Sequence, residues 1–440
     1  MKPKGLLIAV VLLAAIAGAI WWSNKKQAAT PTKSATDTSS KLLTIPADQF
    51  QEIRIKKLTG EVQDLKLVDG KWRIVEPSAL AADQDTVTSM VTSLSALTAD
   101  KTIEESAADL KPYGLDVPTL DIAITKKDGK TAGVIVGDAT PTNSGNYAKL
   151  PDSSRVYTIA SYVKTGLDKT VNDLRDKRLL TFDSDKITRV ALAAKGVPVE
   201  FGKNAQSEWQ ILKPRPLRAD ATQVDSLVGK LKDAKMDPLV SDDDAKKAAA
   251  AYASGTKVAV ATVSDSSGDQ TLEVHKDKDK NYYAKSSVVE GIFKVPADIG
   301  DALDKGIDDF RNKKLFDFGF SDPTKIELKG ATYIKSGDKW MSGARTMDNT
   351  AVQSLIDKLR DLAATKFADQ SAGDPVFEAT VTSNGGKKVE KVTIRKQGSQ
   401  YFAQREGEPS IYELDAKPVD DLQAAASAIK EAAPEPVKKK

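Results

Sequence analysis

The sequence predicts an α+β protein in which an N-terminal transmembrane helix precedes three tandem repeats of an antiparallel-sheet-plus-helices unit. Two recurring patterns predict the repeats. The tryptophans Trp72, Trp209 and Trp340 lie 137 and 131 residues apart, and the phrase NDLRDKRLLTF (172–182) returns as DDFRNKKLFDF (308–318). An uncharged apolar stretch near the N-terminus predicts the transmembrane helix.

The composition excludes several classes of function. Lys and Arg number 65 and Asp and Glu 62, and this balance indicates no nucleic-acid partner, because phosphate binding needs clustered cations. The absence of cysteine excludes disulfides, thiolate metal sites and cysteine nucleophiles. His275 is the one histidine, so histidine-based zinc sites and Ser-His-Asp triads have almost no residues to draw on, and we expect no cofactor or metal.

The stretch GLLIAVVLLAAIAGAIWW lies near the N-terminus. Its 18 residues carry no charge and span about 27 Å as a helix, close to the thickness of a bilayer's hydrocarbon core. Lys2 and Lys4 precede it, and Trp21 and Trp22 end it, where indole rings suit the headgroup boundary. We therefore assign residues 1–22 to a single-pass membrane anchor with these four side chains at the membrane interface.

A cleaved signal peptide is the alternative, because Ala17-Gly18-Ala19 resembles a cleavage site. Both interpretations export the chain that follows. With the N-terminus inside, we expect the protein in the inner (cytoplasmic) membrane and its C-terminal region in the periplasm. Residues 23–45 are mostly polar and predict a flexible linker.

Three α+β repeats are predicted at residues 46–182, 183–319 and 320–433, followed by a disordered basic tail at 434–440. In each repeat, alternating apolar residues lead to the tryptophan, a helical period follows, and further alternating runs are separated by turn residues. This order predicts strands, a helix, a four-stranded antiparallel meander and a closing helix.

An aspartate precedes the helical period of each repeat and predicts its N-cap, because a carboxylate accepts an unpaired N–H of the first turn. The tryptophan before it could form a sugar- or peptide-binding face, but its fixed spacing from the helix favours burial in its own repeat. The aspartates are Asp83, Asp220 and Asp348, which follow Trp72, Trp209 and Trp340 respectively.

We interpret the arginine phrase as the closing helix of repeats 1 and 2 running into the next repeat, since basic residues suit the negative end of a helix dipole. Arg175 and Arg311 belong to this helix end, and Phe182 and Phe318 are expected to fill the joint between repeats. Two arginine clamps for an anion are the functional alternative. The third repeat has no successor and lacks the phrase, which favours the structural interpretation.

The phrase LRDKRLLTF, the segments WRIVEP and WQILKP, and the Ala-Asp pairs before the helices resemble a bacterial family, domain of unknown function 4340. The N-terminal MKPKGLLIAVVLLAAIAGAIWW is similar to that family's single anchor. The resemblance implies an envelope protein with no catalytic residues to transfer, often encoded beside gliding-type ABC transporter components. The third repeat departs from the pattern, with Ala344 in place of the proline.

Three local patterns imitate catalytic or metal motifs. Ser161 and Lys164 match S-x-x-K, but Lys164 would also have to serve a K-T-G motif. DKDKN (277–281) starts like a calcium loop, although Tyr282 stands where that loop needs glycine. We expect a charged hairpin turn there, and a partly exposed strand position for His275.

These observations favour a non-catalytic accessory or scaffold subunit of a membrane assembly, with ABC transporter subunits as candidate protein partners. A module that binds an envelope polymer or peptide is the alternative, and a carboxylate-dependent hydrolase is a third. An uncapped sheet edge would serve either of the first two by accepting a partner's strand.

Overall fold

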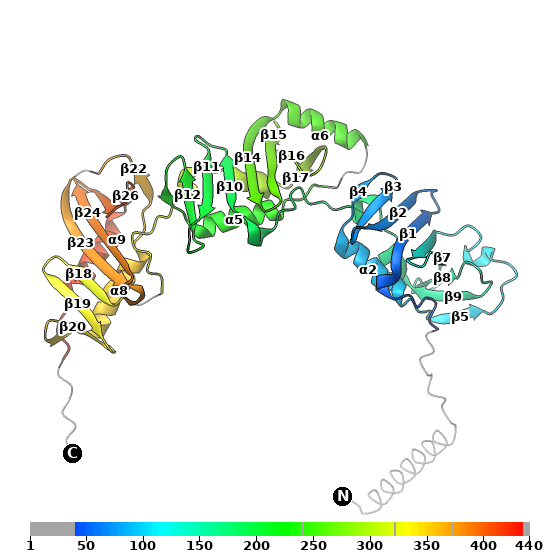
Figure 1. Cartoon of the computed structure of the whole chain (residues 1–440), viewed down its shortest axis with the longest axis horizontal. Coiled ribbons are helices and arrows are strands. Elements are labelled where there is room, and N and C mark those ends of the chain that lie inside the picture. Colours follow the sequence, from blue (N-terminus) through cyan, green and yellow to red (C-terminus); the bar gives the residue numbers. More distant parts are fainter. Residues whose placement is uncertain (1–39, 239–241, 321–322, 372, 434–440) are drawn as a thin grey trace, which may run out of the picture. The chain divides into compact units, whose positions relative to one another are not determined.

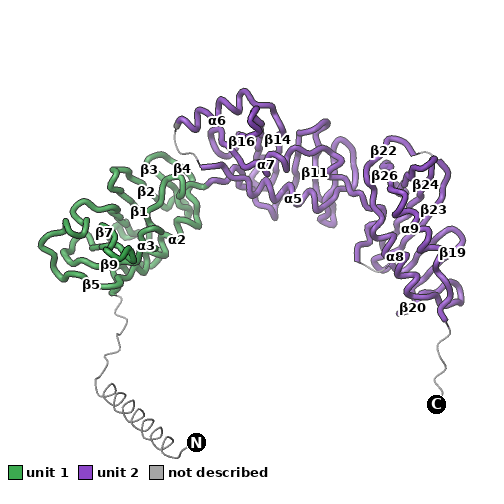
Figure 2. Tube along the Cα trace, turned by 180° about the vertical axis from the view of Figure 1, so that it is seen from behind, with its two compact units in different colours: residues 1–176 green, residues 177–440 purple. Residues whose placement is uncertain are grey.

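The computed structural model describes residues 40–238, 242–320, 323–371 and 373–433. The chain divides into two compact units, residues 1–176 and 177–440 (Figure 2). The expected mixed α+β fold with antiparallel sheets is confirmed, with one sheet in the first unit and two in the second (Figure 1). The predicted anchor (1–22) and tail (434–440) lie outside the described residues. Within the described ranges, no helix is long and apolar enough to cross a membrane.

The sheet of the first unit has the strand order β4-β3-β2-β1-β6-β7-β8-β9-β5. Its helices pack on one face, because Leu94 and Leu167 of the helices share a core with Ile53 and Ile74 of the strands. The elements are β1 (Phe50–Lys57), β2 (Val62–Val68), β3 (Lys71–Glu76), β4 (Leu80–Ala81), α2 (Gln84–Ser95), β5 (Lys101–Glu104), β6 (Leu120–Lys126), β7 (Thr131–Ala139), β8 (Gly145–Lys149), β9 (Val156–Ala160), α3 (Ser161–Leu167) and α4 (Val171–Leu174).

The first sheet of the second unit has the order β13-β12-β11-β10-β14-β15-β16-β17. Leu227 of α5 and Leu303 of α7 share its core with Phe201 and Val263. The elements are β10 (Arg189–Ala193), β11 (Val199–Lys203), β12 (Trp209–Lys213), β13 (Leu217–Arg218), α5 (Ala221–Lys232), α6 (Asp242–Ser254), β14 (Thr256–Asp265), β15 (Gly268–Lys276), β16 (Tyr282–Ser286), β17 (Ile292–Val295) and α7 (Ala297–Leu303).

The second sheet of this unit has the order β21-β20-β19-β18-β23-β24-β25-β26-β22 and its own core under α8 and α9. The elements are β18 (Lys325–Leu328), β19 (Ala331–Ser336), β20 (Lys339–Ser342), β21 (Arg345–Thr346), α8 (Asn349–Asp361), β22 (Lys366–Ala368), β23 (Asp374–Ser383), β24 (Lys388–Gln397), β25 (Gln400–Arg405), β26 (Ile411–Leu414) and α9 (Ala416–Ser427).

The three sheets therefore share one plan. Four strands lead to a main helix (α2, α5 or α8), and a four-stranded antiparallel meander follows it. In the first and third sheets a short strand after the main helix, β5 or β22, pairs with the last meander strand. The middle sheet ends at β17 instead.

Each main helix begins at the aspartate that the sequence indicates. The carboxylate of Asp83 accepts from the N–H of Thr86 at 2.8 Å, that of Asp220 from Gln223 at 3.2 Å, and that of Asp348 from Thr350 at 2.9 Å. These bonds satisfy first-turn N–H groups that have no partner inside the helix. The apolar stripe of each helix is buried against its sheet.

The tryptophans pack in the cores. Trp72, Trp209 and Trp340 have relative exposures of 8%, 7% and 5%, and each belongs to the core of its own repeat. The backbone of Trp72 is tied to the start of α2, because the Gln84 side chain accepts from its N–H and donates to its carbonyl. The fixed spacing between tryptophan and helix thus reflects packing.

The predicted closing helices are wrong over the arginine phrases. In the first, helix α4 stops at Leu174 and Arg175 is extended; in the second, helix α7 stops at Leu303 and only a 3₁₀ turn over Ile307–Asp309 remains. An extended backbone leaves its N–H and C=O groups free for partners outside the segment, which a helix would satisfy internally. Those partners lie in the chain just before and just after the main helix of each repeat.

The first half of each phrase closes a repeat, and we call it the trailing segment. Arg175 pairs with Ala82 and Arg311 with Ala219, next to the N-cap aspartates. The N–H of Asp83 donates to Leu174 at 2.7 Å, and that of Asp220 to Phe310 at 2.8 Å. The third repeat is also closed by a trailing segment, although it lacks the arginine phrase. Glu431 pairs with Met347, and the N–H of Asp348 donates to the carbonyl of Lys430 at 2.9 Å.

The second half of each phrase opens a repeat, and we call it the leading segment. Arg178 pairs with Lys235 and Lys314 with Ala363, in the chain just after the main helix. The first repeat has an equivalent leading segment, in which Lys41 pairs with Thr98.

These pairings move the predicted boundaries, and we number the repeats by them as 40–176, 177–312 and 313–433. Residues 40–45 are not linker, because Leu42, Leu43 and Ile45 lie in the first core. Phe182 and Phe318 do not fill a joint; each belongs to the core of the repeat that it opens.

Replacement of an N-cap aspartate should destabilise its repeat. We expect Asp83→Ala to lower the free energy of unfolding of a 40–176 fragment by about 1 kcal/mol, since the Thr86 N–H loses its acceptor. Urea unfolding followed by Trp72, the single tryptophan of that fragment, measures this. Asp85→Ala in the same first turn is the control, and an equal loss in both variants would contradict the capping role.

Candidate functional site

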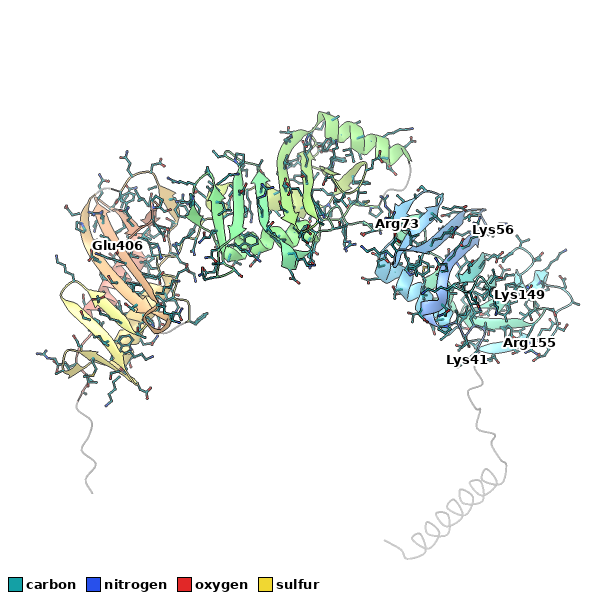
Figure 3. The ribbon with its side chains drawn as sticks, in the orientation of Figure 1. Lys41, Lys56, Arg73, Lys149, Arg155 and Glu406 are labelled. Atoms are coloured by element: carbon teal, nitrogen blue, oxygen red, sulfur yellow. The ribbon has the colours of Figure 1, made fainter. Side chains whose placement is uncertain are left out.

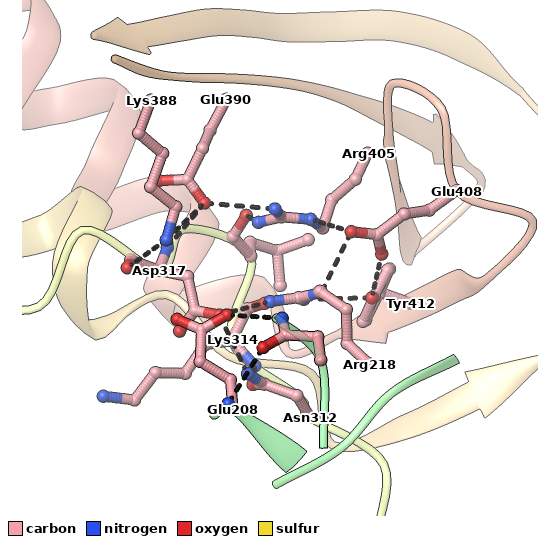
Figure 4. A network of polar contacts seen from close by, with 12 residues as sticks. Glu208, Arg218, Asn312, Lys314, Asp317, Lys388, Glu390, Arg405, Glu408 and Tyr412 are labelled. Carbon is pink, nitrogen blue, oxygen red and sulfur yellow. Dashed lines mark hydrogen bonds and ion pairs between the residues drawn. The ribbon is translucent and has the colours of Figure 1, made fainter. Parts of the chain in front are cut away.

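A network of charged side chains joins repeat 2 to repeat 3 inside the second unit (Figure 4). Arg218, the last residue of β13, donates to Asp317 at 3.0 Å and to the Tyr412 hydroxyl at 3.1 Å. Its Nε lies 2.9 Å from a carboxylate oxygen of Glu408, and Nη2 donates to the carbonyl of Lys314 at 2.5 Å. All four partners belong to repeat 3.

A second layer supports these partners from within repeat 3. Arg405 donates to Glu408 at 2.7 Å, to Glu390 at 3.0 Å and to the carbonyl of Leu315. The Glu390 carboxylate also accepts the N–H of Asp317 at 2.9 Å. Burial alone would lower the pKa of Arg218, but Tyr412, Glu408 and Asp317 together raise it, so the guanidinium stays charged.

Arg311 forms a second contact across the same joint. It is 9% exposed, and its guanidinium carbon lies 3.3 Å from the ring centre of Phe367, a cation–π stack. Its Nη atoms donate to Asp308 and to the Ser410 hydroxyl, both at 2.9 Å. These contacts use the two Nη atoms with which Arg311 would bind an anion. They therefore disfavour the alternative that Arg311 is part of an anion-binding clamp.

Arg175 is the counterpart of Arg311 in the first repeat. Burial lowers the pKa of its guanidinium. Its backbone pairs with Ala82, so the trailing segment holds it beside the N-cap of α2.

A groove of about 750 Å³ opens on repeat 3. It forms because β18 is short: it pairs only with Ala379–Thr382, and Asp374–Glu378 of β23 continue past its end. Tyr333, Phe377 and Pro375 give the groove apolar walls, and Glu327 and Glu378 lie at it too. Burial raises the pKa of Tyr333, which is 7% exposed. A groove of this size and lining suits a short peptide or a sugar chain.

The residues that imitate catalytic and metal motifs form local structural contacts. Ser161 starts α3, and Lys164 forms an ion pair with Asp168 at 2.5 Å. The calcium-like stretch is the turn between β15 and β16, in which Asp277 accepts from the N–H groups of Asp279 and Asn281. Over the part of the chain that the structure describes, no three His, Asp or Glu side chains are placed to hold a metal ion.

The predicted membrane-interface residues Lys2, Lys4, Trp21 and Trp22 lie outside the described residues. Charged side chains such as Lys56 and Arg73 project from the surface of the first unit (Figure 3). Lys149 is different, because it is 7% exposed and its ammonium donates to the carbonyls of Leu150, Pro151 and Ser153.

One family model matches the chain, Domain of unknown function (DUF4340), over residues 72–211 and 209–382. The chain belongs to the DUF4340 family. Each match begins at the tryptophan of one repeat and runs past that of the next, so the DUF4340 pattern includes the main helix, the meander and both segments of the joint. No curated protein and no solved structure matches the chain.

No motif in the sequence points to Arg218, Arg405, Glu390, Glu408 or Tyr412. The signal that could have found Arg218 is its absence from the other repeats: Ala81 and Thr346 occupy the equivalent place before the N-cap pair. A position that changes from small to arginine between repeats indicates a role outside the shared core.

Asp64 on β2 is a buried carboxyl group of the first unit. It is 2% exposed and lies 3.7 Å from Arg54 and 3.6 Å from Lys66. Burial raises its pKa to about 6, and the neighbouring Glu52 adds to the effect more than the two cations offset it.

The raised pKa of Asp64 makes the stability of the first unit depend on pH. Between about pH 4 and pH 6 the folded state binds more protons than the unfolded state, so stability falls as pH rises through this range. We expect a loss of about 2 kcal/mol for the 40–176 fragment. Urea titrations at several pH values measure it; Asp64→Asn should flatten the profile and the exposed Asp116→Asn should not. An unchanged profile in Asp64→Asn would exclude this residue as the cause.

Removal of the Arg218 guanidinium should uncouple repeats 2 and 3. Breaking a buried ion pair costs about 3–5 kcal/mol, but this side chain is 21% exposed, so we expect a loss near 2 kcal/mol in Arg218→Ala. Urea unfolding of a 177–433 fragment, followed separately through Trp209 and Trp340, should change from one transition to two. Arg215→Ala, at an exposed position in the loop before β13, should keep a single transition. Coincident transitions in Arg218→Ala would show that the network does not couple the repeats.

Proposed function

We propose that this DUF4340 protein is a membrane-anchored, non-catalytic envelope protein that acts as an accessory or scaffold subunit of a membrane assembly, with an ABC transport system as the candidate partner. The observation that carries the proposal is the joint between repeats 2 and 3. Arg218 and Arg311 of repeat 2 contact side chains of repeat 3 across this joint.

A joint of this kind favours a structural role. Charge pairs and a cation–π stack between two repeats restrict their relative motion more than a polar linker alone would. Fixed spacing between binding surfaces is what a scaffold supplies. The apolar, uncharged stretch before residue 23 supports a membrane anchor, and the family resemblance supports the choice of an ABC transport system as partner.

The groove on repeat 3 supports a second candidate, a module that binds an envelope peptide or polymer. Tyr333 and Phe377 offer apolar and aromatic surface, and Glu327 and Glu378 offer hydrogen-bond acceptors. The two candidates differ in what contacts the protein: a membrane subunit in the first, an envelope polymer or peptide in the second.

Photo-crosslinking in cells distinguishes the two candidates. A photoreactive residue is placed in the full-length chain at exposed strand positions of each repeat, Lys56, Leu212 and Ile334, with the buried Ile74 as the control. We expect membrane-protein subunits to be captured at one or more exposed positions and nothing at Ile74. Capture of glycan or peptide alone, or of no membrane protein from any exposed position, would reject the scaffold proposal.

A further inference from the structure

The edge of β23 is unpaired where β18 ends. The ladder between these two strands stops at the pair Leu328–Ala379, and Asp374–Glu378 of β23 extend beyond it. Among the described residues, β24 supplies all the backbone partners of this stretch. Successive residues of a strand direct their N–H and C=O groups to opposite sides, so the groups on the side of β18 are not used in a ladder. We call Asp374–Glu378 the free edge.

Repeat 1 places its own chain at the equivalent position. Leu120 of β6 is the counterpart of Phe377, because the segments LDIAIT and FEATVT that they begin correspond in sequence. Strand β1 pairs with β6 as far as Lys57–Leu120, and the N–H of Leu58 donates to the carbonyl of Thr119 at 3.2 Å. Strand β18 turns into β19 before it reaches Phe377. The fold of a repeat therefore accommodates a strand beside the free edge.

Tyr333 of β19 lines the groove beside the free edge, and its hydroxyl has no protein partner. The residue is 7% exposed and packs in the core of repeat 3, yet its hydroxyl bonds to no described residue. The hydroxyls of two other buried tyrosines of the repeat are satisfied, Tyr401 by Asp420 and Tyr412 by Glu408. Buried polar groups normally have partners, so the Tyr333 hydroxyl points to a ligand in the groove.

The walls of the groove favour an apolar side chain next to the free edge. Phe377 and Val376 of β23, Ala331 of β19 and Ala426 of α9 line it, and Val376 is 38% exposed. The β23–β24 ladder skips Val376, and its carbonyl accepts from the Gln423 side chain at the long distance of 3.4 Å. A peptide beside this edge would supply both a closer N–H donor and apolar contact.

The charges at the groove favour a peptide that is not acidic. Two carboxylates, Glu327 and Glu378, and one ammonium, Lys329, line the groove within the described part of the chain. Each carboxylate has one lysine partner on its own sheet, at 2.8 and 3.5 Å, and keeps further lone pairs free. In repeat 1 the counterpart of Glu378 faces Lys56 of β1 across the ladder. A basic residue of an added strand suits the same place.

The C-terminal residues of this chain are poorly suited to the free edge. Residues 434–440 have the sequence PEPVKKK, in which Pro434 and Pro436 lack the N–H that a ladder requires. A peptide segment from a partner protein has no such restriction. The backbone complementarity of the free edge also favours a peptide over a sugar chain, which has no regular N–H and C=O series to pair with β23.

We propose that the groove of repeat 3 binds an extended, non-acidic peptide segment of a partner protein, which adds a strand along the free edge of β23. An inward side chain of the peptide packs against Phe377, and a polar group of the peptide bonds to the Tyr333 hydroxyl. The inference rests on the second candidate function above, peptide binding at this groove, and specifies how the peptide binds.

A library of random peptides of about eight residues, displayed on phage and panned against the full-length protein in detergent, tests the proposal. Enriched peptides are labelled with a fluorophore, and fluorescence anisotropy gives their Kd. We expect sequences without proline and without acidic runs. Methylation of every second backbone amide of the peptide should weaken binding about fivefold, as expected for one hydrogen bond, and methylation of the intervening amides should be tolerated.

Two tyrosine variants locate the peptide in the groove. Tyr333→Phe should weaken peptide binding about fivefold without lowering stability to urea, because its hydroxyl has no partner in the fold. Tyr401→Phe is the matched control outside the groove. Its hydroxyl donates to Asp420, so this variant should lower stability to urea and leave the Kd of the peptide unchanged.

Several results would overturn the proposal. Peptides that bind the groove but tolerate methylation at every amide would retain peptide binding and reject strand addition. Tighter binding to a chain that ends at residue 433 would make the C-terminal residues the occupant. Retention of purified cell-wall glycan strands, with no peptide enriched, would assign the groove to a polymer. Enriched peptides that bind Tyr333→Phe as tightly as the wild-type protein would place the peptide elsewhere. The panning uses purified protein, so its result is independent of the membrane partner sought by photo-crosslinking.

Discussion

The fold depends on the backbone pairing of two short extended segments in each repeat. The trailing segment bonds beside the N-cap aspartate, so the place where the chain leaves a repeat is tied to the place where its main helix begins. The leading segment bonds to the chain just after that helix. Both ends of the helix are thereby fixed to the segments that connect one repeat to the next, because each segment satisfies its backbone N–H and C=O groups at one end of the helix.

Local chemistry made the repeat predictable. Asp83, Asp220 and Asp348 are good N-caps whatever surrounds them, and the period-2 runs of the strands reflect a sheet with one buried face. The tryptophan was assigned to the core because its spacing from the helix is constant, and it is buried in all three repeats. These features need only neighbours within one repeat.

The arginine phrase shows where local chemistry misleads. Basic residues after a helical turn are typical of a helix end, yet Arg175 and Arg178 are extended, because their backbones pair with residues more than fifty positions away. The contacts between repeats 2 and 3 were harder to predict than the conformation of the arginine phrase. Arg218 meets Asp317 and Tyr412, which lie 99 and 194 positions further along the chain, and no periodicity in sequence relates such residues.

Comparison of the repeats with one another separates folding from function. Whatever recurs three times, the N-caps, tryptophans and backbone pairings, is explained by the need to build and connect a repeat. Two features that the described residues show in one repeat have no such explanation: Arg218 at the joint, and helix α6 with its contact to His275. Both lie in the second unit. A sequence that repeats its scaffold and varies these positions places its specific interactions there, since the shared elements alone would make the three repeats interchangeable.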